Sequence, residues 1–474
     1  MKITQSNKGS VLARNVSYSV VANLFSFLVS VTVVLLVPKA IGVVEYGYFQ
    51  LFLFFISYVG FFHFGWCDGV ILRYAGAEWD KLDRTKFSGQ IYLFLFFEVS
   101  IWGFFSLAAF LTFGNDERLF VLLCTALGAI MVLLSTLLRF ILQATNRIKV
   151  YAFLLLLERV VYLTSVVIVL VTGTKDFRFF VVAYLLAQVT TLAMAVWYCR
   201  SLIFTEAEAF SVALKEATTS LRIGSKLLLA NISSMLIVGV VRFGIERVWG
   251  IATFGKISLL LSIISILFLF VNAASIALLP ALRREDDAHF KAMYFPSRMA
   301  LACVLLIAFV FSYPASQIVA LWLPAYADVL VYLPLILPLC LFESAVSLLT
   351  GTYLKVVRRE KDLFIGNFLG LLVSFVLFGI SAFFLKNLAL AVLSMPVALA
   401  VRSFLLERVI KKCLGISAMP VFATEVLASI AFISSAVFVD GYAGVLCYAG
   451  FLVFAFVVSR KTLCVAYKSF HATR

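Results

Sequence analysis

Charged residues stand within apolar stretches at several points of this sequence. A charge near the middle of a membrane-spanning helix costs about 2.5–3.5 kcal/mol, so it normally faces a protein partner or a water-filled cavity. Such residues are candidates for ion coupling or for ion pairs between helices. They are Glu98, Glu158, Arg159, Glu343 and Arg402.

Four further cations, Arg73, Lys226, Arg242 and Lys256, stand near the ends of apolar stretches. Cations in this position can bind an anionic ligand, above all a phosphate. They can also extend toward the lipid head groups, with their stems lying along the apolar surface. The sequence leaves both interpretations open.

The composition places most of the chain in lipid. Hydrophobic residues make up 64% of the sequence and charged residues only 13%, and the mean hydropathy is +1.08. At about 20 residues per crossing, the apolar stretches predict about fourteen transmembrane helices and an all-α polytopic membrane protein. The eight cysteines are scattered singly and the three histidines are far apart in sequence, so we expect no metal site and no cofactor.

Lysine and arginine gather in alternate connections between the apolar stretches, including the one that contains Arg283, Arg284, Lys291 and Arg298. Connections rich in these residues lie in the cytoplasm, so both termini are expected there. This asymmetry, together with attraction to anionic lipids, accounts for the net charge of +15. Because the cations stand in small separate loops, we expect no nucleic-acid partner.

A weak internal repeat relates two parts of the chain at a shift of 208 residues. Ala22-Asn23 corresponds to Ala230-Asn231, Gly42 to Gly250, and Tyr46-Gly47 to Phe254-Gly255. Each copy predicts an apolar helix, a turn with a basic residue and a glycine, and a second apolar helix. Two homologous bundles of this kind are typical of transporters, whose halves rock about a site between them.

The expected organisation is a six-helix bundle over residues 1–200, a cytoplasmic amphipathic connector over 201–222, a second six-helix bundle over 223–412, and two extra transmembrane helices with a tail over 413–474. The T-x-x-E pattern of Thr205 and Glu208 predicts that the connector helix begins there. Pro334 and Pro338 predict a break in the tenth span. The first bundle has no proline inside its spans, so bending is expected in the second bundle.

Several segments resemble the polysaccharide-transport branch of the multidrug/oligosaccharidyl-lipid/polysaccharide exporter superfamily, which includes the Wzx-type O-antigen flippases. They are A-I-G-V-V-E-Y-G-Y-F-Q (40–50), G-W-C-D-G-V-I-L-R-Y-A-G (65–76), V-A-L-W-L-P-A-Y (319–326) and K-V-V-R-R-E-K (355–361). The resemblance implies a V-shaped, pseudo-twofold pair of bundles like that of the drug exporters of the superfamily. It also implies transport without enzyme activity.

The cargo implied by the resemblance is an undecaprenyl-pyrophosphate-linked oligosaccharide, carried to the outer face of the bacterial inner membrane. Arg73, Lys226, Arg242 and Lys256 are then candidates for binding the pyrophosphate. Asn23, Asn231 and Asn272 are candidates for binding the glycan, although asparagine also joins helix to helix in lipid. Membrane lipids, a polysaccharide polymerase and a chain-length regulator of the same pathway are the implied partners.

Two other functions compete with this one. A cation-coupled drug exporter of the same superfamily would need an acidic cavity, whereas the spans expected to line the cavity carry more Arg and Lys than Asp and Glu. An O-antigen polymerase or ligase usually needs a large periplasmic loop, and every outer loop here is shorter than about 15 residues. The flippase is therefore the function that the sequence favours.

Overall fold

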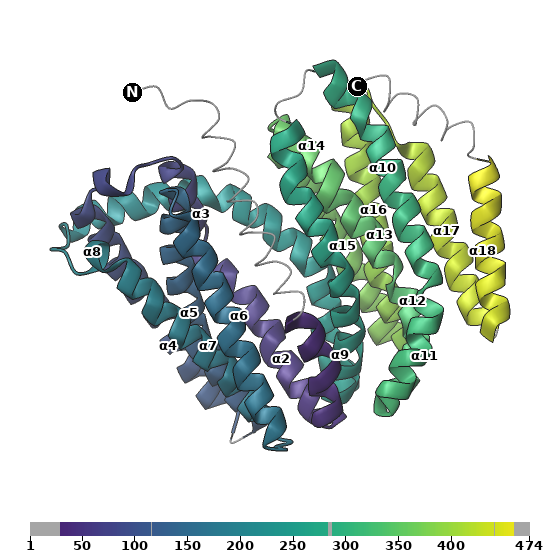
Figure 1. Ribbon diagram of the computed structural model, residues 1–474, viewed down its shortest axis with the longest axis horizontal. Helices are drawn as coiled ribbons and strands as arrows, with labels where there is room; N and C mark the ends of the chain where they lie inside the picture. The colour runs from purple at the N-terminus through teal and green to yellow at the C-terminus, as the bar shows by residue number, and fades with distance from the viewer. Residues whose placement is uncertain (1–28, 115, 283–286, 440, 459–474) are drawn as a thin grey trace. The chain divides into compact units, whose positions relative to one another are not determined.

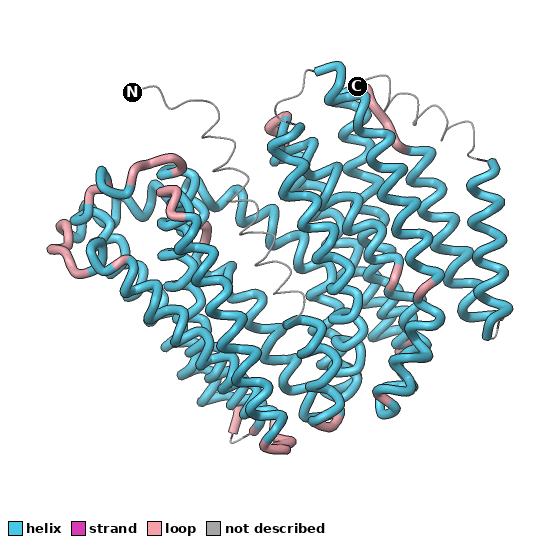
Figure 2. The backbone as a smooth tube through the Cα atoms, in the orientation of Figure 1, coloured by secondary structure: helices cyan, strands magenta, loops and turns pink. Residues whose placement is uncertain are grey.

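The computed structural model describes residues 29–114, 116–282, 287–439 and 441–458. These residues form helices joined by short loops, with no strand among them (Figure 2). Eleven helices are at least 18 residues long and apolar enough to cross a membrane, and three shorter apolar helices lie at Val29–Ala40, Pro324–Ile336 and Ala443–Ala455. The all-α polytopic fold predicted from the sequence is confirmed. Both chain termini fall outside the described residues.

Large apolar side chains remain exposed on these helices. On one transmembrane helix, Phe104 and Leu111 are 75% and 76% exposed. A water-soluble protein rarely leaves apolar surface of this extent uncovered. Lipid is the solvent in which such a surface is stable.

The internal contacts divide the chain into two compact units, Met1–Leu229 and Ala230–Arg474. The boundary falls within a helix, seven residues beyond the end of the predicted connector. The connector therefore packs as part of the first unit. The finer division of the second unit into a six-helix bundle and two extra helices stays a prediction.

Among its described residues, the first unit contains five of the membrane-spanning candidates, Val43–His63 and four longer helices, together with several short helices (Figure 1). Its elements are α2 (Val43–Val59), η1 (Gly60–His63), α3 (Trp66–Tyr74), η2 (Trp79–Lys81), α4 (Arg84–Thr112), α5 (Glu117–Ala144), α6 (Ile148–Val171), α7 (Phe177–Tyr198) and α8 (Arg200–Ile203). Asp83 caps α4 by accepting hydrogen bonds from the Thr85 hydroxyl and the Lys86 amide. These hydrogen bonds lower the pKa of Asp83.

The chain breaks between α2 and α3 without a proline. After the 3-10 turn η1, Phe64 has φ = 51° and Gly65 has φ = 91°, both in the left-handed region. Glycine reaches this region at no steric cost, which is why Gly65 can begin the next helix in a new direction. A helix of the first unit is thus interrupted by a glycine turn, which the absence of proline could not indicate.

The longest helix, α9 (Phe210–Leu282), contains a reversal at Gly250, where φ is 82° and ψ is 175°. The Arg242 guanidinium donates a hydrogen bond to the Ser258 hydroxyl across this point at 3.1 Å. A straight helix would hold residues sixteen positions apart about 24 Å from each other, so the two arms of α9 must run back alongside one another. The turn that the repeat predicts around Gly250 is present, and its counterpart Gly42 likewise precedes the start of α2.

The connector helix begins at Phe210 and not at Thr205, so the predicted capping box was wrong. The Thr205 hydroxyl instead donates to the Ser201 carbonyl, and the Glu208 carboxylate accepts from the Thr85 hydroxyl on α4. Tertiary contacts with α4 therefore replace the local capping bonds. Along the connector, the small residues Ala213 and Ala217 are buried, while Phe210 is 66% exposed.

The second unit contains the remaining elements. They are α10 (Asp287–Val310), α11 (Ser312–Trp322), η3 (Pro324–Tyr332), α12 (Leu333–Ile336), α13 (Pro338–Ser344), the π-helix η4 (Ala345–Thr350), α14 (Gly351–Val356), α15 (Glu360–Gly379), the π-helix η5 (Ile380–Phe384), α16 (Leu388–Leu414), α17 (Met419–Phe438) and α18 (Gly441–Val458). At Pro334 and Pro338 the helix is divided into α12, which ends at Ile336, and α13, which begins at Pro338, but Leu337 between them keeps helical backbone angles (φ −57°, ψ −36°). The prolines thus interrupt the helical hydrogen bonds without a non-helical residue between the two segments.

Candidate functional site

Arg73, a candidate pyrophosphate ligand, lies at the end of α3 and binds the connector. Its guanidinium donates to the Glu216 carboxylate at 2.5 Å, to the Ser220 hydroxyl at 2.9 Å and to the Glu216 carbonyl at 3.1 Å. Both side chains of the pair are about four-fifths buried. In this structure Arg73 fastens α3 to the connector, and a role in phosphate binding stays a prediction.

The same two helices approach closely through glycines. A Cβ added to Gly224 would lie 1.9 Å from the Gly65 carbonyl oxygen, and one added to Gly69 would lie 2.0 Å from the Ser220 carbonyl oxygen. Small residues spaced four apart on both helices are typical of close crossings in membranes. Gly65 faces Gly224, Gly69 faces Ser220 and Arg73 binds Glu216, so one antiparallel register unites the crossing and the ion pair.

The other candidate cations are distributed as follows. Lys226 is exposed. The Arg242 guanidinium lies over the Phe254 ring at 5.5 Å, in addition to its bond with Ser258. The Lys256 ammonium donates to the Asp328 carboxylate at 2.5 Å. Arg242 and Lys256 thus stand near the two sides of the Gly250 reversal, whereas Arg73 and Lys226 belong to the other unit.

The glycan candidates are less well defined by the structure. Asn23 lies outside the described residues, and the side chain of Asn272 is also not described. Asn231 is exposed on α9. A buried amide that the sequence analysis did not single out, Asn367 on α15, donates to the Ala230 carbonyl at 2.9 Å. This contact is a helix-to-helix bond of the kind expected for asparagine in lipid.

Two of the predicted intramembrane charges form one ion pair. The Arg402 guanidinium on α16 donates to the Glu343 carboxylate on α13 at 2.8 Å and to the Ser234 hydroxyl on α9 at 2.7 Å. The Arg402 side chain is fully buried, whereas Glu343 is 27% exposed. The pair therefore joins three helices of the second unit and keeps one carboxylate partly accessible.

In the first unit, Glu158 on α6 binds Arg139 on α5 at 2.8 Å. Both side chains of this pair are largely buried. The neighbouring candidate Arg159 lies within electrostatic reach of Tyr162 and Tyr184. Glu98 on α4 differs from the other candidate carboxylates. It is 1% exposed, and its carboxyl group accepts a hydrogen bond from the Trp102 indole at 3.2 Å.

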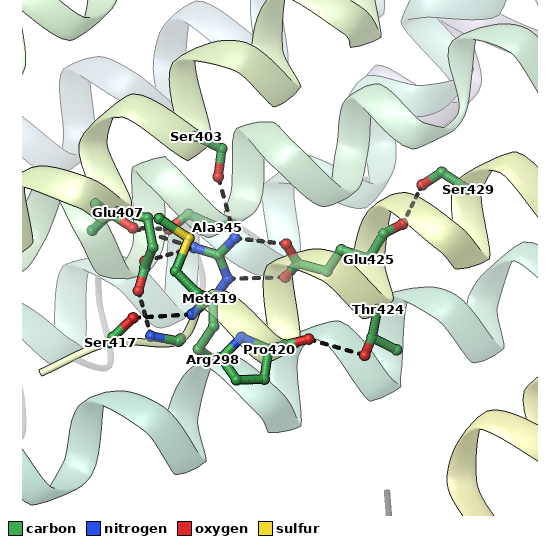
Figure 3. A network of polar contacts seen from close by, with 12 residues as sticks. Arg298, Ala345, Ser403, Glu407, Ser417, Met419, Pro420, Thr424, Glu425 and Ser429 are labelled. Carbon is green, nitrogen blue, oxygen red and sulfur yellow. Dashed lines mark hydrogen bonds and ion pairs between the residues drawn. The ribbon is translucent and has the colours of Figure 1, made fainter. Parts of the chain in front are cut away.

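A buried ionic network in the second unit was missed. Arg298 on α10 forms a two-pronged contact with Glu425 on α17, with N–O distances of 2.9 and 2.6 Å, and lies 3.7 Å from Glu407 on α16 (Figure 3). The Glu407 carboxylate also accepts hydrogen bonds from the Tyr294 hydroxyl and the Ala418 amide.

The three charged side chains of this network are at most 1% exposed. The assignment of Arg298 to a connection between spans was wrong, because this cation lies eleven residues after the start of helix α10 and is fully buried. The signal that could have located the network was Glu425, a lone carboxylate within the apolar residues of α17.

The structure also bears on metal binding. Within the described ranges, no three His, Cys, Asp or Glu side chains lie close enough together to hold a metal ion.

No protein-family model matches the chain, and no curated protein matches it. Solved structures do. The lipid II flippase MurJ in an inward-closed conformation is similar with a TM-score of 0.59 and 13% identity, over 95% of this chain and 100% of that one. A multidrug resistance MATE family transporter of the MOP superfamily, facing inward, is similar with a TM-score of 0.60 and 12% identity, over 89% and 96%. This chain has the fold that these two transporters share.

Proposed function

We propose that this chain is a flippase, located in the bacterial inner membrane with both termini in the cytoplasm. Its cargo is an undecaprenyl-pyrophosphate-linked oligosaccharide, an O-antigen repeat unit or a related glycan. The cargo moves from the cytoplasmic to the outer face as the two repeat-related halves alternate in access. The lipid tail can remain in the bilayer, so the protein has to bind only the pyrophosphate and the sugars.

The observation that carries this proposal is the extent of the match to the lipid II flippase. That match leaves out 5% of this chain. Helices α17 and α18, of 20 and 18 residues, make up a larger share of the 474 residues than 5%, so the match includes part of this pair. The match to the multidrug transporter leaves out 11%, enough to omit both helices.

Buried polar groups give second support. Arg298 and Arg402 are fully buried, and their polar partners, four for Arg298 and two for Arg402, come from other helices. These two cations are thus paired by the fold, as charges within membrane spans normally are. Drug export remains the second candidate function, because the multidrug transporter has the same fold.

Deletion of the gene in its own host is expected to remove the surface glycan and to leave its lipid-linked precursor inside the cell. Re-expression of the chain should restore the glycan, because no other step of glycan assembly is affected. Surface glycan is measured by gel staining and lectin binding, and tolerance to cationic drugs is measured in parallel. Unchanged surface glycan together with lost drug tolerance would favour the drug exporter instead.

Arg242 offers a test of the pyrophosphate site. A guanidinium binds two phosphate oxygens at once, which an ammonium cannot do. We therefore expect Arg242→Lys to reduce surface glycan and Arg242→Ala to abolish it, both at normal abundance in the membrane. Lys256→Arg, at the neighbouring cation, serves as the matched control and should be tolerated. Full glycan display by Arg242→Ala would place the pyrophosphate site elsewhere, and Lys226 or Arg159 would be tested next.

A further inference from the structure

Glu98 lies at the middle of α4, in the apolar interior of the first unit. One carboxyl oxygen accepts the hydrogen bond from the Trp102 indole, and the other has no hydrogen-bond partner among the described residues. No cation of the described part of the chain lies within ion-pair distance of it. In contrast, Glu158 has Arg139 at 2.8 Å and Glu343 has Arg402 at 2.8 Å.

An ionised carboxylate in this position would be costly. The effective penalty for burying an unpaired charge is several kcal/mol, even after the surrounding protein relaxes. A single hydrogen bond to a charged group contributes only about 1.5–3 kcal/mol of stabilising free energy, less than this penalty. The favourable form of Glu98 in this packing is therefore the neutral acid, which carries one proton.

A metal cation is a poor alternative occupant of this position. Hard cations require several oxygen ligands, whereas the side chain bonded to Glu98 is that of Trp102, which packs among aromatic rings. Trp102 lies 4.8 Å from Phe62 and 5.4 Å from Phe105, measured between ring centroids. The Trp102 indole also directs an N–H toward the carboxylate, which repels a cation. A proton needs no other ligand.

Residues of the break between α2 and α3 pack on α4 at positions before and after Glu98 in the sequence. Phe62 packs on Trp102, Phe64 on Phe97, and Trp66 on Phe94. Phe64 and Gly65 hold the left-handed conformations of this break. The buried Trp66 indole N–H has no hydrogen-bond partner among the described residues either. An unpaired donor and an unpaired acceptor thus lie on the two elements that meet here.

The other titratable and charged groups near Glu98 have partners of their own or carry no positive charge that could pair with it. His63 accepts a hydrogen bond from the Gly65 amide at Nδ1, and its Nε2 lies 3.9 Å from the Asp68 carboxylate. The buried thiol of Cys67 lies within electrostatic reach of Asp68, Glu98 and Arg139. Arg139 is already paired with Glu158. None of these groups compensates a negative charge on Glu98.

We propose that Glu98 holds an exchangeable proton and that transport by this chain is coupled to release and recovery of that proton. A shift of the Phe62–Trp66 segment would admit water to the carboxyl group. Glu98 would then give its proton to that water and become a carboxylate, which hydration stabilises. Return of the segment requires that the carboxylate first regain a proton from water on the side to which it is open.

The connector transmits such a shift within the first unit. Gly65, at the break, lies directly against Gly224 of α9, and Arg73 further along α3 is fastened to Glu216. Because the backbones touch at Gly65 and Gly224, a movement of the connector helix must also displace the break between α2 and α3. Hinges of this kind, at the ends of elements, absorb the change in backbone angles during transport.

The proton itself can be observed without the cargo. The full chain in lipid nanodiscs is titrated from acidic to alkaline pH, and the infrared C=O stretch of protonated carboxyl groups is recorded. We expect a band in the native protein that persists at neutral pH, is lost at alkaline pH and is absent from Glu98→Gln. Glutamine keeps the size and the acceptor for Trp102, so the variant should fold. The same band in Glu98→Gln would overturn the assignment to Glu98.

Coupling is tested with surface glycan in the gene-deleted host, and this part rests on the proposed function. We expect Glu98→Gln to lower surface glycan about tenfold or more, an effect of at least about 1.4 kcal/mol on the limiting step. Glu98→Asp, which keeps a proton site, should retain transport. Glu360→Gln, at an exposed position of α15, is the control for loss of a carboxylate. Normal glycan in Glu98→Gln would overturn coupling. Failure of the native chain to restore glycan, with the infrared band present, would refute the flippase and leave the proton site standing.

Discussion

Replacement of Glu425 with alanine is expected to destabilise the second unit by about 3–5 kcal/mol, the usual cost of breaking a buried ion pair from one side. The variant leaves the Arg298 guanidinium buried without its two-pronged partner, and Glu407 is 3.7 Å away with its oxygens already engaged. Thermal unfolding in detergent and abundance in the membrane measure the effect. Glu360→Ala, at an exposed position of α15, is the control and should change little.

A paired replacement separates charge burial from loss of packing. Arg298→Met combined with Glu425→Leu removes both charges and keeps most of the volume, so its stability should exceed that of Glu425→Ala. If Glu425→Ala unfolds at the same temperature as the native chain, the network of Figure 3 contributes nothing to holding α17 against α10 and α16.

The second large effect is expected at the crossing of α3 and the connector. In Gly224→Ala the new Cβ would lie 1.9 Å from the Gly65 carbonyl oxygen, so the two backbones must separate. Overpacking of this kind costs about 1–3 kcal/mol. The ion pair of Arg73 and Glu216 stands in the same register and should be weakened as well. Gly103→Ala on α4, where the added Cβ meets nothing within 4 Å, is the matched control.

Trypsin cleavage in membrane vesicles reports on this crossing directly. Lys215 and Arg222 are exposed on the connector, and cleavage there requires the helix to open locally. We expect faster cleavage in Gly224→Ala than in the native chain, and native-like cleavage in Gly103→Ala. Equal rates in all three proteins, with equal thermal stability, would mean that the connector is not held by this crossing.

Features that depend on local sequence could be predicted. The apolar stretches predicted the helices, Pro334 and Pro338 predicted where helical hydrogen bonding is interrupted between α12 and α13, and the repeat located the turn at Gly250. Glu343 and Arg402 were recognised as intramembrane charges, because their cost in lipid depends only on the residue and its position in a span. Their pairing could not be predicted, because it joins residues 59 positions apart.

Features that depend on tertiary contacts could not be predicted. The T-x-x-E pattern at Thr205 does not form a helix cap, because the Glu208 carboxylate accepts a hydrogen bond from Thr85 on α4. Arg298 belongs to a basic segment of the sequence and is buried because Glu425 and Glu407 compensate its charge. The glycines Gly65 and Gly224 carry no side chain, so no periodic pattern indicates that they face each other.

The most direct test of the flippase uses the purified chain in liposomes that contain an undecaprenyl-pyrophosphate-linked oligosaccharide in both leaflets. An enzyme added outside trims the glycan that it can reach. The flippase predicts that nearly all of the glycan becomes accessible over time when a proton gradient is applied, and that the inner-leaflet share stays protected in protein-free liposomes. Continued protection of that share with the native chain present, in liposomes where the protein is shown to be folded, would contradict the proposed function.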